Sequence, residues 1–317
     1  MTVGTVGGSL AAALATVFLV PYAENNGYLK AAIIVAVVSF LAMSLISLFG
    51  KERYKVKEEV LEKPASLRDT WEYLIHNKYL LYFYAYRMIS GSIAVSMLIY
   101  VAKYCLGDVK YMSMVVAISV IPICILFLFS GKIFKRFDKI VVYRFCMIAT
   151  ILMNAITLFV GYQNRTLAIA CLVVIAVLAI LPSILMGAIP QDCVEYGTYK
   201  TETRKEGITF ALQTFANKLT AAVATIITGG VLTFVGYDVA AEKAATEAHK
   251  VVEIAVSQAT VSGMWKASFI VPIIGQLLAI GFLFAYNLRD KDVQIMSDCN
   301  AGKITKAEAE ALLSRKY

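Results

Sequence analysis

Residues 166–189 read TLAIACLVVIAVLAILPSILMGAI, a run of 24 residues without a charged side chain. A helix needs about 20 mainly apolar residues to cross roughly 30 Å of hydrocarbon, so this run can span a membrane. Similar runs recur along the chain, and together they are 4–23, 30–50, 79–104, 111–131, 140–161, 166–189, 208–236 and 265–287. They lack the short alternating pattern of barrel strands. The sequence therefore predicts an all-α membrane protein with about eight transmembrane helices.

The composition of the whole chain supports a membrane protein. Of 317 residues, 59% are hydrophobic and 16% are charged, and the mean hydropathy is +0.71. A soluble domain carries about a quarter charged residues, and a disordered chain is far less apolar. Both of those classes are excluded. The net charge of +8 would suggest nucleic acid in a soluble protein, but basic loops on one side of a membrane explain it here.

Basic residues are unevenly distributed among the segments that join the spans. If the N-terminus is cytoplasmic, the cytoplasmic segments hold 20 of the 30 Lys and Arg residues and the outer loops hold seven. This distribution follows the positive-inside rule. It predicts a multi-pass protein of the cell membrane with both termini in the cytoplasm and no nucleic-acid partner.

Few residues suit a metal site or a catalytic site. The six cysteines show no Cys-x-x-Cys spacing, and the two histidines, His76 and His249, fall in different loops. The sequence contains no recognisable nucleophile–base set or phosphate-binding loop. We expect a protein that is not an enzyme and that has no metal or other resident cofactor.

The longest polar loop separates two spans from six, whereas many transporters consist of two six-helix halves. We predict that 1–50 are the last two helices of an N-terminal bundle and that 51–78 are the central cytoplasmic loop. Residues 79–289 would then form a six-helix C-terminal bundle, and 290–317 a cytoplasmic tail. On this interpretation about four helices are missing upstream. An eight-helix protein with an uneven middle loop is the alternative.

Lys218 is the strongest candidate for a functional residue inside the membrane. It lies 12 residues after Glu206, near the middle of its span. An unpaired Lys at this depth costs at least about 2.5–3.5 kcal/mol, so such residues usually face a cavity and have a partner. At helical spacing Lys218 shares a face with Thr214 and is flanked by Gln213 and Asn217. This face suits a water-filled substrate path.

Two other basic residues lie within spans. Arg144 is close enough to the cytoplasmic end to reach the interface, and Arg87 lies about 13 Å into its span, so it either faces the path or reaches the interface. All 22 acidic residues fall in loops, tails or span ends. Because coupling to Na⁺ or H⁺ normally needs an intramembrane carboxylate, the chain as it stands should not be a competent cation symporter. The partner of Lys218 would be a missing helix, another subunit or an anionic substrate, and we favour the missing helix.

Residues 190–207, PQDCVEYGTYKTETRKEG, combine acidic and basic side chains at high density. The pattern predicts a cytoplasmic loop of about seventeen residues between two spans. Its charges are numerous enough to hold a cytoplasmic gate open or shut, and a solvated loop with local ion pairs is the simpler alternative. The candidate gate residues are Asp192, Glu195, Tyr196, Gly197, Lys200, Arg204 and Glu206.

This segment, followed by Gln213-Thr214-x-x-x-Lys218, resembles the hallmark D-x-V-[DE]-Y-G-x-x-K-x-x-x-R-x-E-[GS] of the glycoside–pentoside–hexuronide:cation symporters. They are the melibiose carrier family of the major facilitator superfamily. The resemblance covers essentially the whole chain, starting at the family's fifth helix. It implies a partial major facilitator fold, in which two six-helix bundles would surround a sugar cavity and work by alternating access.

The resemblance also implies roles for individual residues. Lys218 would lie beside a cation site whose carboxylates belong to helices absent from this chain, and Gln213 and Thr214 would line the sugar path. Na⁺ or H⁺ would be the coupling ion of the full-length family. The family's tenth helix, 166–189 here, contains no aromatic residue, which argues against a galactoside substrate.

Three functional hypotheses follow. The first is a sugar:cation symporter, with a small-molecule sugar or glycoside, Na⁺ or H⁺ and the lipid bilayer as partners. The second is a cation-independent facilitator or exporter of an organic anion attracted to Lys218 and Arg87. The third is a non-transporting membrane partner protein that docks a cytosolic protein through its tail, where Thr305 and Glu308 are spaced as a helix capping box.

Overall fold

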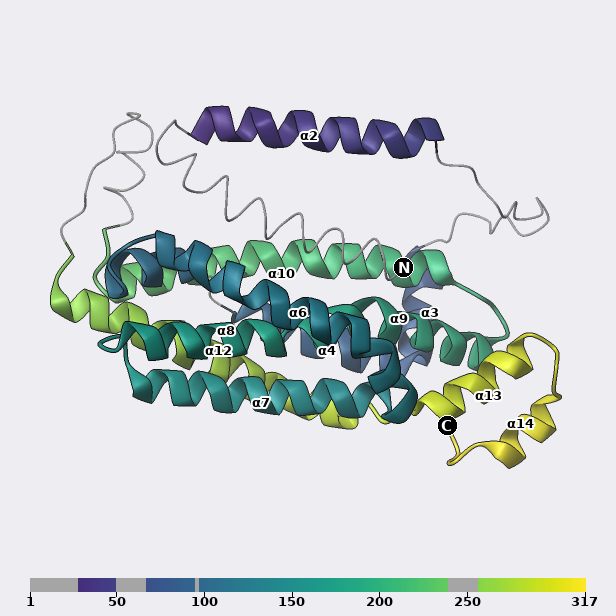
Figure 1. Ribbon diagram of the computed structural model, residues 1–317. Coiled ribbons are helices and arrows are strands. Elements are labelled where there is room, and N and C mark those ends of the chain that lie inside the picture. The colour runs from purple at the N-terminus through teal and green to yellow at the C-terminus, as the bar shows by residue number, and fades with distance from the viewer. Residues whose placement is uncertain (1–27, 50–66, 95–96, 239–255) are drawn as a thin grey trace. The chain divides into compact units, whose positions relative to one another are not determined.

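The computed structural model describes residues 28–49, 67–94, 97–238 and 256–317 (Figure 1). The expected first span, 4–23, lies outside the described residues, as do most of the central loop and most of the outer loop after residue 238. The chain divides into two units, Met1–Arg68 and Asp69–Tyr317. In the first unit the helix α2 (Tyr28–Phe49) occupies the expected span 30–50 and carries a short apolar segment, Ala32–Leu41.

The part of the second unit that the structure describes is built from helices, with no strand among them. They are α3 (Leu67–His76, beginning just before the unit boundary), α4 (Lys78–Ser92), α5 (Leu98–Tyr100), the π-helix η2 (Val101–Cys105), α6 (Lys110–Arg136), α7 (Lys139–Val160), α8 (Arg165–Leu178), α9 (Ile180–Thr201), α10 (Glu206–Phe234), α12 (Gln258–Ala285), α13 (Asp290–Asn300) and α14 (Lys306–Leu312).

Five helical segments among the described residues are long and apolar enough to cross a membrane. They are α6, α7, the continuous pair α8–α9 over Arg165–Thr201, α10 and α12. The expected all-α membrane protein is therefore confirmed. The expected span 79–104 is interrupted, because α4 ends at Ser92 and α5 begins only at Leu98.

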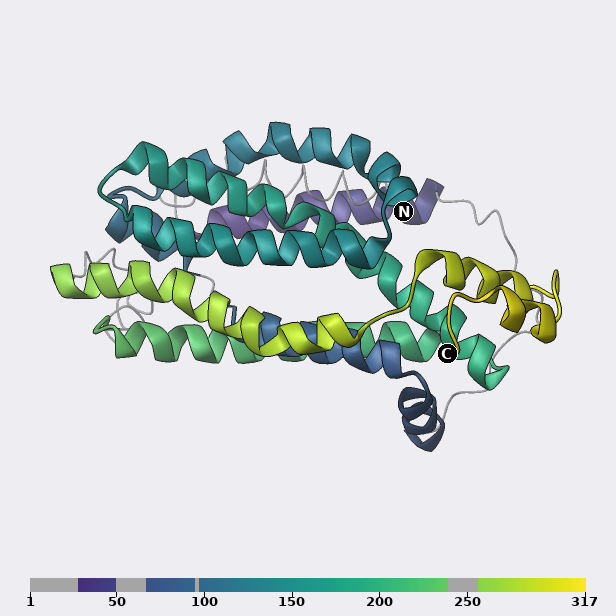
Figure 2. The same ribbon diagram turned by 90° about the horizontal axis from the view of Figure 1, so that it is seen from below.

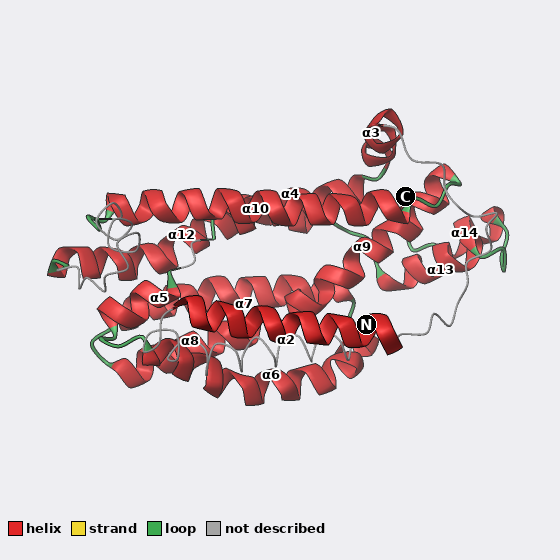
Figure 3. Ribbon diagram, turned by 90° about the horizontal axis from the view of Figure 1, so that it is seen from above, coloured by secondary structure: helices red, strands yellow, loops and turns green. Residues whose placement is uncertain are grey.

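The long helices of the second unit run along one another in two layers (Figure 2). In the first layer α4 packs against α10 and α12, and in the second α8 packs against α6 and α7. Contacts between α7 and α12 join the layers, and α9 continues from α8 towards α13 (Figure 3). The short helices α13 and α14 lie beyond one end of the bundle, which we call the α13 end.

Aromatic residues fill the core at the α13 end. Tyr79, Phe83, Tyr86 and Tyr143 are each at most 3% exposed, and their rings meet edge to face with centroids about 6 Å apart or less across α4, α7 and α9. A second core cluster, around Trp265 and its neighbours on α12, occupies the opposite end. The two clusters hold the helix ends in fixed positions, which places the charged residues described below.

One expected boundary is wrong. The segment 190–207 was predicted to be a loop of about seventeen residues, but α9 continues to Thr201 and leaves only 202–205 between α9 and α10. Glu202 ends the helix in a left-handed conformation with φ 57°. The charges of this segment are compatible with a helix because α9 extends past its apolar run and pairs its charged side chains with neighbouring elements.

The capping box expected near the C-terminal tail is confirmed. The Thr305 hydroxyl accepts a hydrogen bond from the Glu308 N–H, and the Glu308 carboxylate accepts one from the Thr305 N–H. These bonds start α14, which an ion pair between Lys306 and Glu202 links to the end of α9 at 2.8 Å. The tail is therefore folded against the α13 end.

Candidate functional site

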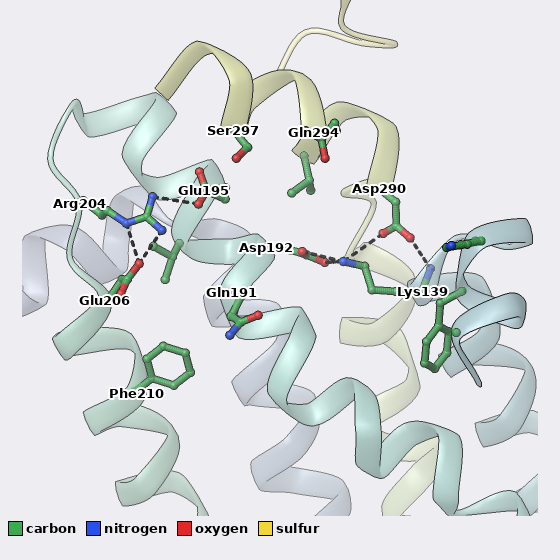
Figure 4. A pocket seen from close by; sticks show the side chains of 15 residues that line it. Lys139, Gln191, Asp192, Glu195, Arg204, Glu206, Phe210, Asp290, Gln294 and Ser297 are labelled. Atoms are coloured by element: carbon green, nitrogen blue, oxygen red, sulfur yellow. Dashed lines mark hydrogen bonds and ion pairs between the residues drawn. The ribbon is translucent and has the colours of Figure 1, made fainter. Parts of the chain in front are cut away.

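The last three turns of α9 form the centre of a charged site at the α13 end (Figure 4). Asp192 is 9% exposed, and its carboxylate oxygens lie 2.5 and 2.7 Å from the Lys139 ammonium at the start of α7. The same ammonium lies 3.7 Å from the Asp290 carboxylate, which also accepts a bond from the Lys139 N–H at 3.0 Å. One lysine therefore links α7, α9 and the first turn of α13.

Arg204 lies in the short link between α9 and α10 and organises a second ion-pair cluster around Glu195, one turn after Asp192 on α9. Its guanidinium lies 2.9 Å from Glu195 and donates to Glu206 at 2.6 Å. Asn300 donates through its side-chain amide to the main-chain and side-chain oxygens of Glu195, both at 2.9 Å. This cluster ties α9 to the start of α10 and the end of α13.

A pocket of about 650 Å³ opens between the two clusters. The charged residues that line it are Lys135, Lys139, Asp192, Glu195, Arg204, Glu206 and Asp290. Partial burial raises the pKa of the Asp290 carboxyl above its ordinary value, although Lys139 opposes that shift. All of these charges except Lys135 form the ion pairs described above, which join α7, α9, α10 and α13, so the pocket cannot widen without breaking ion pairs.

The other predicted gate residues do not line this pocket. Tyr196 is buried, and its ring meets that of Tyr79 at 4.8 Å. At Gly197 a Cβ atom would lie 2.7 Å from the Tyr73 hydroxyl oxygen and 2.8 Å from the Asn77 amide nitrogen. Tyr196 and Gly197 therefore pack α9 against α3 and α4. Lys200 donates to the main-chain oxygen of Tyr317.

Sequence reasoning missed three members of the site: Lys139, Asp290 and Asn300. Lys139 closes the short basic turn between α6 and α7, and Asp290 is in the first turn of α13, as a helix N-terminus favours. Neither position distinguishes a buried ion pair from a solvated charge. The pairing of Lys139 with Asp192 and Asp290 joins residues 53 and 151 positions apart, so local spacing carries no signal for it.

The polar face predicted on α10 is present. Lys218, Thr214 and Asn217 are exposed on the described structure, and Gln213 donates its side-chain amide to the Met186 carbonyl at 3.0 Å. Among the residues described, no carboxylate pairs with Lys218. The face thus presents one ammonium group together with hydroxyl and amide groups, at mid-length of a membrane helix.

The structure does not place Arg87 on that face. The Arg87 guanidinium is partly buried and interacts with the Tyr143 hydroxyl of α7. Arg144 has main-chain partners instead: its guanidinium donates to the Leu283 and Tyr286 carbonyls at 3.2 and 2.6 Å. These carbonyls end α12, so Arg144 caps that helix as well as reaching the end of the membrane segment.

Comparison with known proteins defines the family. Residues 1–290 match the family model of the MFS/sugar transport proteins. The chain belongs to this family. Its expected resemblance to symporters of the major facilitator superfamily is thereby confirmed, as is the expectation of a transporter-type membrane protein rather than an enzyme.

Several named proteins are similar to this chain. A protein of Escherichia coli (strain K12) named as a sulfoquinovose importer is 26% identical over 294 residues, which cover 90% of this chain and 60% of the relative. A protein of Salmonella typhimurium (strain LT2) named as a 2,3-dihydroxypropane-1-sulfonate exporter is 26% identical over 313 residues, 94% of this chain and 65% of the relative. An uncharacterised symporter of Bacillus subtilis (strain 168) is 30% identical over 192 residues, 59% of this chain and 41% of the relative. The chain therefore spans roughly 41–65% of the length of these relatives.

Proposed function

We propose that this MFS chain belongs to a carrier for a small hydroxylated organic anion, of the sulfonated sugar class. The observation that carries the proposal is the exposed Lys218 on α10, which has no carboxylate partner among the described residues. Two relatives support it, because both of their names denote a hydroxylated molecule with a sulfonate group. A single ammonium group beside hydroxyl and amide side chains matches that combination.

In this proposal the residues of the α10 face have distinct roles. Lys218 attracts the sulfonate, and because it lies in a membrane span its attraction is stronger than at a water-exposed surface. Thr214 and Asn217 exchange hydrogen bonds with substrate hydroxyls. Gln213 is held by the Met186 carbonyl and keeps the neighbouring turn in place.

The ion-pair clusters at the α13 end serve as the cytoplasmic gate. We place this end in the cytoplasm of a cell-membrane protein because the basic loops lie there. Alternating access requires the pocket between the clusters to open and close, and the pairs made by Lys139 and Arg204 are the contacts that change. Both termini are then cytoplasmic.

Cation-coupled uptake of an uncharged sugar is the second candidate. The motif of 190–207 and the 30% identity to a named symporter favour it, with Na⁺ or H⁺ as the coupling ion. In that case Lys218 acts on the cation site instead of contacting substrate. The two candidates differ in whether the transported molecule itself carries a negative charge.

Uptake of radiolabelled sulfoquinovose into proteoliposomes that contain the purified chain tests the proposal. We expect saturable uptake that falls at least about tenfold in Lys218→Met and recovers partly in Lys218→Arg, because the loss of a charge-assisted hydrogen bond costs roughly 1.5–3 kcal/mol. Lys266→Met is the matched control, since Lys266 is an exposed lysine on α12.

The contrary outcomes are equally specific. If Lys218→Met leaves sulfoquinovose uptake unchanged, the role assigned to Lys218 is wrong. Uptake of an uncharged sugar that requires an imposed Na⁺ or pH gradient would favour the symporter instead. If neither solute enters with any gradient, a non-transporting partner protein becomes the better hypothesis.

A further inference from the structure

A second pocket, of about 340 Å³, lies inside the helix bundle and shares no lining residue with the pocket at the α13 end. Side chains from α5, η2, α6, α7, α8 and α12 line it, and none of its lining residues belongs to α10. Pockets that bind small molecules measure about 300–1,000 Å³, so this one is large enough for a small ligand. It is therefore separate from the α10 face that carries Lys218.

Every polar side chain that lines this pocket is uncharged. Thr150 donates its hydroxyl to the Cys146 carbonyl at 2.8 Å, and Asn154 donates its amide to the Thr150 carbonyl at 2.9 Å. Ser268 likewise donates to the Met264 carbonyl at 2.7 Å. Because these donors are engaged within their own helices, the side-chain oxygens are the groups left to meet a ligand, and oxygen atoms of this kind accept hydrogen bonds.

One lining acceptor is buried and unsatisfied. Among the described residues, Gln276 Oε1 and Trp265 Nε1 are buried polar atoms without a hydrogen-bond partner. The two residues are 11 positions apart on α12, about three helical turns, so they share a face with Phe269. Buried polar groups in native proteins nearly always have a partner. The Gln276 side chain lines the pocket, so rotation of its carboxamide would present this oxygen to a ligand there.

Several irregular backbone positions of the bundle lie around this second pocket. Met97 and Leu98 follow the interruption between α4 and α5, Val101 begins the π-helix, and Pro272 lies inside α12. All four line the pocket. Backbone irregularity at membrane depth is tolerated where it is buried in protein or lines a cavity, and interrupted helices mark binding sites in many transporters.

We propose that this pocket binds a small uncharged polyol. Hydroxyl groups would donate to the oxygens of Asn154 and Gln276, and the Phe269 ring would cover an aliphatic face of the ligand. An anion would meet acceptors and no cationic side chain, and an apolar chain would leave the Gln276 side-chain oxygen without a partner. A bare metal cation would leave most of the volume unfilled. The proposal does not depend on the transport function proposed for the α10 face.

Trp265 provides a built-in probe of binding. The chain has two tryptophans, and Trp71 is 67% exposed on α3, so Trp71→Phe leaves only Trp265. The Trp265 ring lies 4.8 Å from the Phe269 ring, measured between centroids, and Phe269 lines the pocket. Glycerol, erythritol and D-glucose are titrated separately into the purified full chain while Trp265 fluorescence is recorded.

At least one of these polyols should give a saturable change in fluorescence. Gln276→Leu should weaken its binding about tenfold, because a buried hydrogen bond to the ligand is lost. Ser268→Ala should weaken it severalfold and serves as a second variant that alters packing less. Gln258→Leu, the same substitution at an exposed position on α12, should leave binding unchanged.

Thermal unfolding separates a binding role from a structural one. Without polyol, Gln276→Leu should unfold at the same or a higher temperature, since it removes an unpaired buried acceptor. At the same polyol concentration, the parent chain should gain more stability than Gln276→Leu. The proposal would be overturned by a lack of saturable response to all three polyols, or by the same fluorescence change on addition of NaCl. Polyol affinity in both Gln276→Leu and Ser268→Ala equal to that of the parent chain would also overturn it.

Discussion

Gly197 shows how a single missing side chain sets the position of α9. A Cβ atom at this residue would lie 2.7–2.8 Å from atoms of Tyr73 and Asn77, closer than real Cβ contacts allow. Asn77 must remain where it is because it caps α4 through the Leu80 N–H and donates to the Cys193 carbonyl at 2.7 Å. The glycine is therefore required by close approach, even though glycine lowers helix propensity.

Gly197→Ala should destabilise the protein by about 1–3 kcal/mol, because the added methyl group overpacks the contact between α9 and α4. Gly187→Ala is the matched control on the same helix, since a Cβ atom there meets nothing within 4 Å. That control should be neutral or stabilising by roughly 0.5–1 kcal/mol. Thermal unfolding of both purified variants checks the prediction, and equal effects would contradict it.

At the scale of elements, Asp292 fastens the chain after α14 to α13. Its carboxylate accepts hydrogen bonds from the Ser314 N–H at 2.9 Å, from the Ser314 hydroxyl at 2.5 Å and from the Tyr317 hydroxyl. Burial acts to raise its pKa, but these hydrogen bonds and the nearby Arg289 outweigh burial, so the pKa of Asp292 lies below its ordinary value. A carboxyl with a lowered pKa stabilises the folded state when it is ionised.

The attachment of this segment should therefore depend on pH in one direction. The stabilisation is complete above the ordinary aspartate pKa of about 3.9, and it is lost as the pH falls through the lowered pKa of Asp292. Hydrogen exchange of the Ser314 amide, corrected for intrinsic rates, should show protection that disappears on acidification. Asp292→Asn should abolish most of that protection already at neutral pH.

Asp298→Asn is the control for this measurement, because Asp298 also lies on α13 but pairs only locally with Lys303 and Gln294 among the described residues. Its protection profile should match that of the parent chain. Protection of Ser314 at neutral pH that is equal in Asp292→Asn and the parent chain would show that Asp292 does not hold the segment.

The elements also show where sequence reasoning succeeds. The apolar runs predicted α6, α7, α10 and α12 because length and hydropathy alone decide whether a helix can cross a bilayer. The interruption after Ser92 was not predicted, although the small residues Ser90, Gly91 and Ser92 stand at that point; the segment 79–104 contains no proline.

At the scale of the whole molecule, Lys139 joins three elements that are distant in sequence. Its ammonium lies 2.5 Å from Asp192 on α9 and 3.7 Å from Asp290 on α13. The neighbouring Cys193 is fully buried, with an exposed fraction of 0%. Release of Lys139 should therefore loosen the end of α9 and expose this thiol.

We predict that Lys139→Ala accelerates the reaction of Cys193 with N-ethylmaleimide by at least about tenfold, because a partner of a partly buried ion pair is removed. The measurement uses a chain in which Cys105, Cys124, Cys146, Cys171 and Cys299 are replaced by alanine. Lys135→Ala is the control, since Lys135 lines the same pocket and is exposed.

Exchange of the two charges tests whether the pair itself is responsible. The double variant Lys139→Asp with Asp192→Lys should return the labelling rate towards that of the parent chain, while each single variant labels fast. If Lys135→Ala accelerates labelling as much as Lys139→Ala, the general charge of the pocket controls the thiol and the pair does not.

The candidate site was predictable only in part, because the partners in its ion pairs are distant in sequence. The density of charges in 190–207 predicted a gate, which stays a prediction, and Asp192, Glu195, Arg204 and Glu206 line one pocket. Their partners Lys139 and Asp290 come from other helices, and only the packed bundle brings them together. The helical form of the segment was missed because a charge run alone does not distinguish a solvated loop from a helix with distant partners.

The contact between Arg144 and the end of α12 forms late in biosynthesis, because the two sides of the contact are synthesised at different times. Arg144 is made about 140 residues before the carbonyls of Leu283 and Tyr286 to which it donates. At roughly 5–20 residues per second, α7 waits about 7–28 s for these partners. During that interval the Arg144 guanidinium must donate its hydrogen bonds to water or to lipid phosphate at the membrane surface. Nascent chains halted before residue 283 should therefore hold α7 less firmly in the bilayer than finished ones.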